Sequence, residues 1–344
     1  MGSFSGIELS DRAQNLLEKS IIIDCRDPTF LMYRFTSDDK EEYWEAVKQS
    51  GITAICVDPA WVDDGFRDAA LAFSAWYKRI TNHGAILALT ADDFQKAKQQ
   101  GKNAFVLNLQ SPTPVENEVG LVEVLQRMGL RIMQLAYQRR NYLAEGVGEP
   151  SASGLSKLGF EVLEEMNRVG VVADLAHATE KTMWDVLRHS KKPVINSHSA
   201  VRSIVDHPRN MSDELLKALA GTGGVYSVSA YSAFLKKDGA KTGSTLDDWI
   251  RHVNYLVKLI GPDHVGIGFD VGEFRNAAEV HILHMRFKEA PGASPELRYV
   301  KELRSRRNFP HLVEALVKAG HSDEVIQKIL GQNILRVFRD VWGA

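Results

Sequence analysis

Two histidines and an aspartate stand at the ends of three short apolar segments of the chain. His177 and His198 each follow such a segment, with one helix-length stretch between them, and Asp270 follows the third segment, residues 264–269. If these segments are parallel strands of one sheet, the three side chains emerge at the same end of that sheet. Neutral imidazole suits zinc and related ions, and a carboxylate serves as a ligand or a proton acceptor. The spacing therefore predicts a metal-binding or acid–base site at the carboxyl ends of the strands.

The three segments belong to a pattern along the whole chain, in which short apolar runs alternate with amphipathic stretches. Eight strand–helix units without a long linker predict an α/β fold, the (β/α)8 TIM barrel. A doubly wound sheet is the alternative, but no glycine-rich turn follows the first strand. A weaker apolar run, residues 85–89, is expected outside the main sheet. The eight predicted strands are residues 20–24, 52–57, 103–109, 130–135, 171–175, 193–196, 223–228 and 264–269.

The domain organisation is predicted to be a single barrel over residues 1–344, because a chain of 344 residues suits one large barrel. Residues 271–307 are the least regular part, with two prolines and a basic run. They are expected to form an insertion after the last strand, near the mouth of the barrel. Helical periodicity returns over residues 308–341 and predicts C-terminal helices.

Composition narrows the classes of partner. The formal net charge is −2 and the Lys and Arg residues are scattered, so no nucleic-acid or polybasic membrane surface is expected. No apolar run approaches the ~20 residues of a membrane span, and the N-terminus lacks a signal-peptide pattern. The two cysteines, Cys25 and Cys56, are too few for a disulfide framework. Free thiols and a cytoplasmic location are therefore expected.

Several other residues at predicted strand ends could take part in chemistry, because barrel enzymes carry their active sites at the carboxyl ends of the strands. Metal ligands and acid–base groups recur among them, which makes the set more informative than any one member. The strand-end residues are Asp24, Cys25, Asp27, Gln110, Tyr137, His177, His198 and Asp270.

At these positions the chain resembles a known family, the membrane (renal) dipeptidases, which are the M19 metallopeptidases of the amidohydrolase superfamily. The resemblance extends over most of the chain. It is carried by residues 153–156 (SGLS), 174–177 (DLAH), 193–200 (PVINSHSA), 207–213 (HPRNMSD), 266–270 (GIGFD) and 329–338 (ILGQNILRVF).

The resemblance implies a dinuclear zinc hydrolase of dipeptides on a distorted barrel, and a homodimer. His177 and His198 match the two histidines of the family's second metal. Asp270 matches the aspartate that binds the first metal and handles the proton of the attacking water. Arg209 matches the arginine that holds the substrate carboxylate. These roles are chemically coherent, because a metal lowers the pKa of bound water towards ~7 and a guanidinium can grip a carboxylate in bidentate fashion.

The first-metal site departs from the family pattern. The family has His-x-Asp after its first strand, whereas this chain reads IDCRDP over residues 23–28. In one register Cys25 and Asp27 take the ligand positions, and a thiolate could replace imidazole on zinc. In the other register Arg26 and Pro28 stand there, and Arg26 could place a positive charge where a metal would sit.

Two further positions also depart from the family. Gln110 stands where the family has a bridging glutamate, and a neutral amide is a poor bridge between two cations. Tyr137 replaces a histidine that contacts the reacting centre, and can still donate a hydrogen bond to an oxyanion. Asn141, which follows Arg139 and Arg140, either reaches a substrate anion or belongs to a solvated turn.

These observations predict a hydrolase of a small amide or dipeptide-like substrate that bears a carboxylate. Zinc or another divalent metal is expected, as one ion rather than two, on His177, His198 and Asp270 or a water molecule. Two other outcomes remain open: a pair of metal ions whose ligands include Cys25 and Asp27, or no metal at all.

In this hypothesis Arg209, Gln110 and Asn141 bind substrate, Asp270 is the general base or a ligand, and Tyr137 polarises the carbonyl. One alternative is a lyase, isomerase or decarboxylase of a small carboxylate, with one metal or none. Another is an inactive barrel retained for binding, against which the four retained family residues argue.

Overall fold

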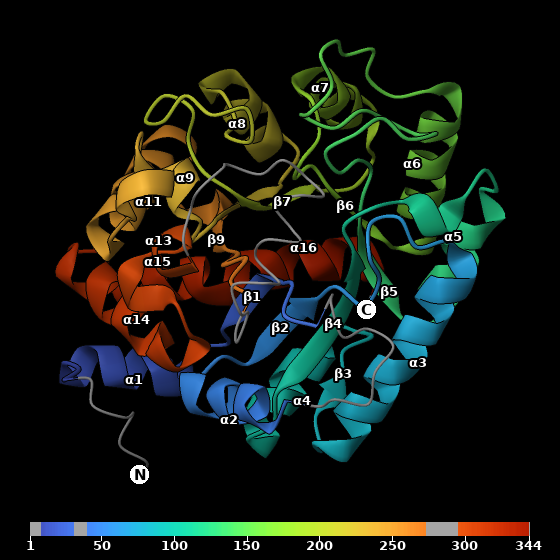
Figure 1. Cartoon of the computed structure of the whole chain (residues 1–344). Coiled ribbons are helices and arrows are strands. Elements are labelled where there is room, and N and C mark those ends of the chain that lie inside the picture. Colours follow the sequence, from blue (N-terminus) through green and yellow to red (C-terminus); the bar gives the residue numbers. More distant parts are fainter. Residues whose placement is uncertain (1–7, 31–39, 273–294, 344) are drawn as a thin grey trace.

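The centre of the molecule is a sheet of eight parallel strands that is nearly closed into a barrel and surrounded by helices (Figure 1). This computed structural model describes residues 8–30, 40–272 and 295–343. The strands follow one another in the order β1-β2-β4-β5-β6-β7-β8-β9, and β3 pairs with β4 outside this path. The prediction of a (β/α)8 barrel is therefore confirmed, as is the place of the weak apolar run outside the main sheet.

The eight barrel strands fall on the eight predicted segments, with shifts of a few residues. β7 begins and ends later than predicted, so that His198 lies within the strand instead of after it. β3 is the short segment Ile86–Leu87. The barrel strands are β1 Ile23–Asp27, β2 Ala54–Val57, β4 Ala104–Leu109, β5 Leu130–Gln134, β6 Val172–Asp174, β7 Ile195–Ser199, β8 Val225–Val228 and β9 Val265–Ile267.

Several helices begin and end at residues that suit helix termini. For example, the Ser156 side chain accepts a hydrogen bond from Gly159 N (3.0 Å) at the start of α6, and Gly170 ends that helix with φ 79°. The long helices are α1 Asp11–Lys19, α2 Glu41–Ser50, α3 Phe66–Asn82, α4 Asp92–Gln100, α5 Gly120–Arg127, α6 Lys157–Val169, α7 Glu180–His189, α8 Asp213–Gly221, α11 Leu246–Ile260, α14 Phe309–Lys318 and α16 Asn333–Trp342. The short ones are α9 Ser232–Leu235, α10 Gly239–Thr242, α13 Pro295–Arg298 and α15 Asp323–Gln327.

The last helix, α16, covers the amino-terminal end of the barrel. Its Ile334 and Phe338 side chains belong to the same apolar cluster as residues from the strands, including Val172 and Val225. Its Arg336 donates a hydrogen bond to the Gly223 carbonyl (2.7 Å), just before β8. Because this end is filled with apolar side chains, a polar site has room only at the carboxyl ends of the strands.

The barrel closes between β1 and β9 through a side chain as well as the backbone. The Asp24 carboxylate accepts hydrogen bonds from Phe269 N (2.9 Å) and from the Arg306 guanidinium (3.2 Å), and Asp270 N donates to the Arg26 carbonyl (3.2 Å). Arg306 also pairs with Asp27 (3.2 Å). The last strand is thus joined to the first by a buried carboxylate that a buried guanidinium neutralises.

A bulge in β1 decides which of its side chains face the site. Asp24 pairs with Ile55, and Asp27 pairs with Val57, so β1 advances three residues where β2 advances two. Such an extra residue bends a strand and changes the direction of its side chains.

Within the described residues, no helix is long and apolar enough to cross a membrane. Of the predicted insertion at 271–307, residues 273–294 lie outside the described part of the chain.

We expect Asp24→Asn to lower the free energy of unfolding by about 3 kcal/mol, because it leaves a buried guanidinium short of a counter-charge. Urea denaturation at pH 7 measures the loss. Asp323→Asn is the control, since it alters the exposed ion pair with Arg12 (2.7 Å) and should cost much less. Equal losses in the two variants would contradict the closing role of Asp24.

Candidate active site

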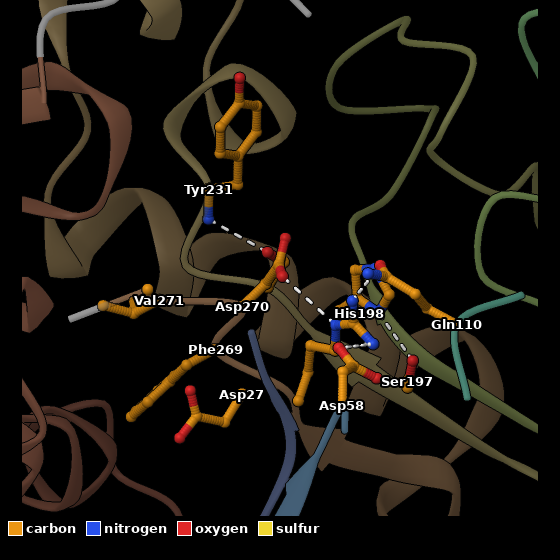
Figure 2. A network of polar contacts seen from close by, with 12 residues as sticks. Asp27, Asp58, Gln110, Ser197, His198, Tyr231, Phe269, Asp270 and Val271 are labelled. Carbon is orange, nitrogen blue, oxygen red and sulfur yellow. Dashed lines mark hydrogen bonds and ion pairs between the residues drawn. The ribbon is translucent and has the colours of Figure 1, made fainter. Parts of the chain in front are cut away.

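The strand ends bring six polar side chains together at the mouth of the barrel. Asp58, Gln110, His198 and Asp270 of this group are labelled in Figure 2. Each comes from a different strand or from the residue or loop that follows it. They are Arg26 in β1, Asp58 after β2, Gln110 after β4, His177 after β6, His198 in β7 and Asp270 after β9.

The two predicted histidines face each other. Their Nε2 atoms are 3.1 Å apart, and both rings are buried. Tyr137 lies against His177, with ring centroids 4.0 Å apart and the planes at 29°. The structure therefore brings His177, His198 and Tyr137 into one cluster.

A relay of hydrogen bonds behind His198 sets its tautomer. The Ser197 hydroxyl donates its one proton to the Asp174 carboxylate and lies 2.6 Å from His198 Nδ1. Ser197 can then only accept from His198, so Nδ1 carries the proton and Nε2 presents a lone pair. Asp174 is held by Ser197 N (2.9 Å) and Ala176 N (3.0 Å). This is the kind of support that orients metal-binding histidines.

Both histidines are neutral at physiological pH. Burial, and then the positive charges of nearby arginines, hold the pKa of each imidazole well below its usual value. The arginines are Arg26 and Arg209 in both cases. His177 Nδ1 is buried without a hydrogen-bond partner among the described residues. Its tautomer therefore depends on what its Nε2 contacts, which is either the lone pair of His198 or a ligand.

Arg26 occupies the centre of the site. Its three guanidinium nitrogens each meet a different oxygen: Nη1 pairs with Asp58, Nη2 donates to Gln110 Oε1, and Nε lies 3.4 Å from Asp270 Oδ1. Burial opposes the charge of Arg26, but Asp58 and Asp270 outweigh it and hold its pKa above the usual value. Burial also raises the pKa of Asp58 to about 8, against the attraction of Arg26.

The predicted ligands Cys25 and Asp27 are not in this cluster. The register in which these two residues would be metal ligands predicted that they would be. Cys25 lies in an apolar cluster with Cys56. Asp27 accepts hydrogen bonds from Thr29 and Tyr43 (2.5 Å each), and Figure 2 shows it apart from His198 and Gln110. The physical reason is the β1 bulge, which turns Arg26 into the mouth of the barrel. Among the residues of β1, it is therefore Arg26 that contacts the other strand-end residues Asp58, Gln110 and Asp270.

The donors present do not fit two metal ions. In the part of the chain that the structure describes, no three His, Cys, Asp or Glu side chains come together so as to hold a metal ion. The histidine pair alone does fit one ion, because two nitrogens on a tetrahedral zinc stand roughly 3.3 Å apart at Zn–N distances of 2.0–2.1 Å. The Nε2 separation of 3.1 Å is close to that value.

Of the remaining predicted residues, one lies in the site and one does not. Arg209 is buried, donates a hydrogen bond to the His198 carbonyl (3.0 Å) and lies over the Phe234 ring (5.0 Å). Asn141 instead holds its own loop together. Its amide group donates to the Leu135 carbonyl (3.0 Å) and accepts from the amide nitrogens of Leu143 and Ala144 (2.7 and 3.0 Å). The alternative of a turn residue therefore describes Asn141 better than substrate binding.

Backbone strain marks two of the site residues. His177 and Asp270 have φ angles of 67° and 57°, in the left-handed region that side chains rarely adopt. Such strain persists where surrounding contacts determine the conformation, often at functional sites. Gly268, two residues before Asp270, permits a close approach of two backbone segments, because a Cβ on it would lie 1.7 Å from the Ser197 carbonyl oxygen. β9 can therefore approach β7 only with glycine at this position.

Three functional residues escape prediction from the sequence: Asp58, Asp174 and Ser197. Asp58 carries the same signal as the others, since it directly follows a strand. Asp174 is a charged residue at the end of an otherwise apolar strand, which indicates a buried polar contact. Nothing in the sequence shows that Ser197 is the link between this aspartate and His198.

A parallel βα barrel with paired histidines and an acid at its strand ends defines the class of amidohydrolase-type barrels. Within that class, the family model for membrane dipeptidases (peptidase family M19) matches residues 11–280, and the chain belongs to this family. The family is one of dipeptidase-like, metal-dependent hydrolases, and it implies a divalent metal ion. The resemblance inferred from the strand-end motifs is thereby confirmed.

Individual relatives agree with this assignment. Dipeptidase tcpJ of Claviceps purpurea is 32% identical over 257 residues, which are 74% of this chain and 55% of that protein. Dipeptidase verJ of Clonostachys rogersoniana is 31% identical over 257 residues, 74% of this chain and 60% of that protein. The chain thus spans a little over half the length of these curated relatives.

Solved structures share the whole fold. An amidohydrolase from Pseudomonas aeruginosa superposes with a TM-score of 0.87 at 33% identity, over 96% of this chain and 99% of that one. A metallopeptidase from Rhodobacter sphaeroides, solved with a phosphinate mimic of the dipeptide L-Ala-D-Ala, gives a TM-score of 0.79 at 18% identity, over 94% and 100%. The second likeness concerns the fold alone.

We expect Ser197→Ala to weaken zinc binding by about 10- to 100-fold, because His198 loses the partner that fixes its tautomer and orientation. Competition with a chromophoric chelator measures the affinity, and circular dichroism checks the fold. Ser203→Ala is the matched control, because the Ser203 hydroxyl contacts the surface residue Asp213 (2.8 Å). Unchanged affinity in folded Ser197→Ala would show that the relay does not act on the metal site.

Proposed function

We propose that the protein hydrolyses a small amide or dipeptide-like substrate that carries a free carboxylate. The single observation that carries the proposal is the buried histidine pair, with Nε2 atoms 3.1 Å apart, beside the Arg209 guanidinium. Membership of the dipeptidase family supports the reaction type, and Arg209 supplies a buried cation for the substrate's carboxylate.

We propose further that one divalent ion, zinc being the expected one, acts in this site on His177 and His198. When bound, the ion would polarise the substrate carbonyl and lower the pKa of water at the site. The chain itself holds both imidazoles neutral and oriented, His198 through Ser197 and Asp174. Since zinc sites that catalyse reactions usually have three protein ligands, substrate or water must complete this one.

The other roles fall to residues already near the pair. Asp270, half-buried and strained, is the group placed to accept the proton of an attacking water. Tyr137 stacks on His177 and can direct its hydroxyl to a carbonyl oxygen. Gln110 accepts a hydrogen bond from Arg26 through Oε1 and orients its guanidinium, while its amide nitrogen is left for the predicted contact with substrate.

One observation favours a second candidate, a lyase, isomerase or decarboxylase of a small carboxylate. Arg26 lies among the strand-end residues, where it pairs with Asp58 and Asp270. A fixed cation beside two acids can stabilise an enolate or carboxylate without water activation.

A panel of dipeptides and N-acyl amino acids separates these candidates. We expect release of free amino acid, one metal ion or fewer per chain by elemental analysis, and loss of activity with a chelator that zinc restores. If no member of the panel is cleaved while small hydroxy or keto carboxylates are converted, the second candidate replaces the first. If compounds of the panel are bound but none is turned over, the barrel is a binding protein.

We expect Arg209→Met to lower kcat/KM for a dipeptide with a free carboxylate by about 100-fold, because the variant lacks the anchoring charge. The C-terminally amidated form of the same dipeptide should lose little, which provides an internal control in one protein sample. Arg202→Met, a change at a more exposed arginine bonded to the Pro208 carbonyl (3.3 Å), should leave both substrates unaffected. An equal loss for both substrates in Arg209→Met would indicate a structural role.

A further inference from the structure

We infer that Arg26 is a permanent, protein-borne cation in the place of the family's first metal ion, so that the site accepts at most one ion. This deepens the proposed function and its catalytic part rests on it, whereas the number of ions rests on the geometry of Arg26 alone. The guanidinium is buried and meets one oxygen-bearing side chain at each of its three nitrogens.

The partners of Arg26 are the groups that a metal ion would need. Asp270 and Gln110 stand at the positions where the family has a first-metal aspartate and the bridging acid. Both instead direct an oxygen at Arg26, and Asp58 adds a third from the end of β2. A guanidinium cannot be deprotonated in proteins, so the positive charge is present at every working pH. A divalent ion among the same oxygens would meet strong repulsion in this buried setting.

Two sequence changes fit each other in this arrangement. A glutamate at position 110 would add a third acidic side chain, beside Asp58 and Asp270, around a single positive charge, whereas the amide of Gln110 accepts a hydrogen bond without adding charge. Pro28, at the family's second ligand position, has no donor atom in its side chain. The cation and the neutral amide therefore form one unit, which explains why the bridging acid is absent.

Arg26 acts in this proposal as a positioning residue. It orients Asp270 through the 3.4 Å contact between Nε and Oδ1. Its charge closes the position beside the histidine pair to a second ion.

The test is the number of zinc ions per chain, measured by elemental analysis after incubation with excess zinc and desalting. We expect one ion or fewer in the wild-type protein and one additional ion in Arg26→His/Gln110→Glu, which restores two donors of the family pattern. Gln110→Glu alone should gain none, because Arg26 still occupies the position. Arg131→His, a change at a buried arginine bonded to the Leu89 carbonyl (2.8 Å) away from the site, should also match the wild type.

Two ions in the wild-type protein would overturn the inference, as would no additional ion in a double variant that circular dichroism shows to be folded. If the double variant does not fold, cobalt titration of the wild-type protein decides, since saturation at two ions overturns the inference and saturation at one supports it. These measurements need no substrate. Failure of every dipeptide to react would therefore reject the proposed function and leave the inference standing.

Discussion

A guanidinium that cannot lose its charge is buried at the mouth of this barrel, and the surrounding structure must neutralise it. Removing such a charge from water costs several kcal/mol unless hydrogen bonds and counter-charges compensate. Arg26 finds them in Asp58, Gln110 and Asp270, which come from the ends of three other strands. The requirement of one side chain thus fixes the relative positions of β1, β2, β4 and β9 at the site.

A second buried guanidinium, that of Arg306, also contacts β1. Arg306 pairs with Asp24 and Asp27 and lies over the Tyr43 ring of α2, on the side of β1 that faces the helices. The same strand therefore carries one charged cluster towards the site and another towards the helices. Asp24 also accepts from Phe269 N, so the cluster that neutralises Arg306 brings β9, and with it Asp270, to its place.

The fold and half of the site can be predicted from the sequence. The other half cannot, and the reason is physical. The eight apolar runs predict the strands, and positions after them predict His177, His198 and Asp270 as neighbours. A register that differs by one residue cannot be decided in this way, because the extra residue in β1 between Asp24 and Asp27 changes which of its side chains reach the site. Contacts such as Arg306 with Asp24 join segments 282 residues apart, and no local pattern reveals them.

The inferred placement of a guanidinium where an ion would lie separates two tasks that a pair of metals would perform together. A metal attracts negative charge and also lowers the pKa of water, whereas a guanidinium can only attract charge and donate hydrogen bonds. Arg26 can therefore position Asp270 and balance its charge, but activation of water must come from the histidine side or from the carboxylate itself. Chemistry on this barrel then depends on the neutral imidazoles, because His177 and His198 present the only uncharged ring-nitrogen donors among the site residues described above. The buried relay through Ser197 and Asp174 keeps the lone pair of His198 directed towards His177, and so preserves the geometry on which such chemistry depends.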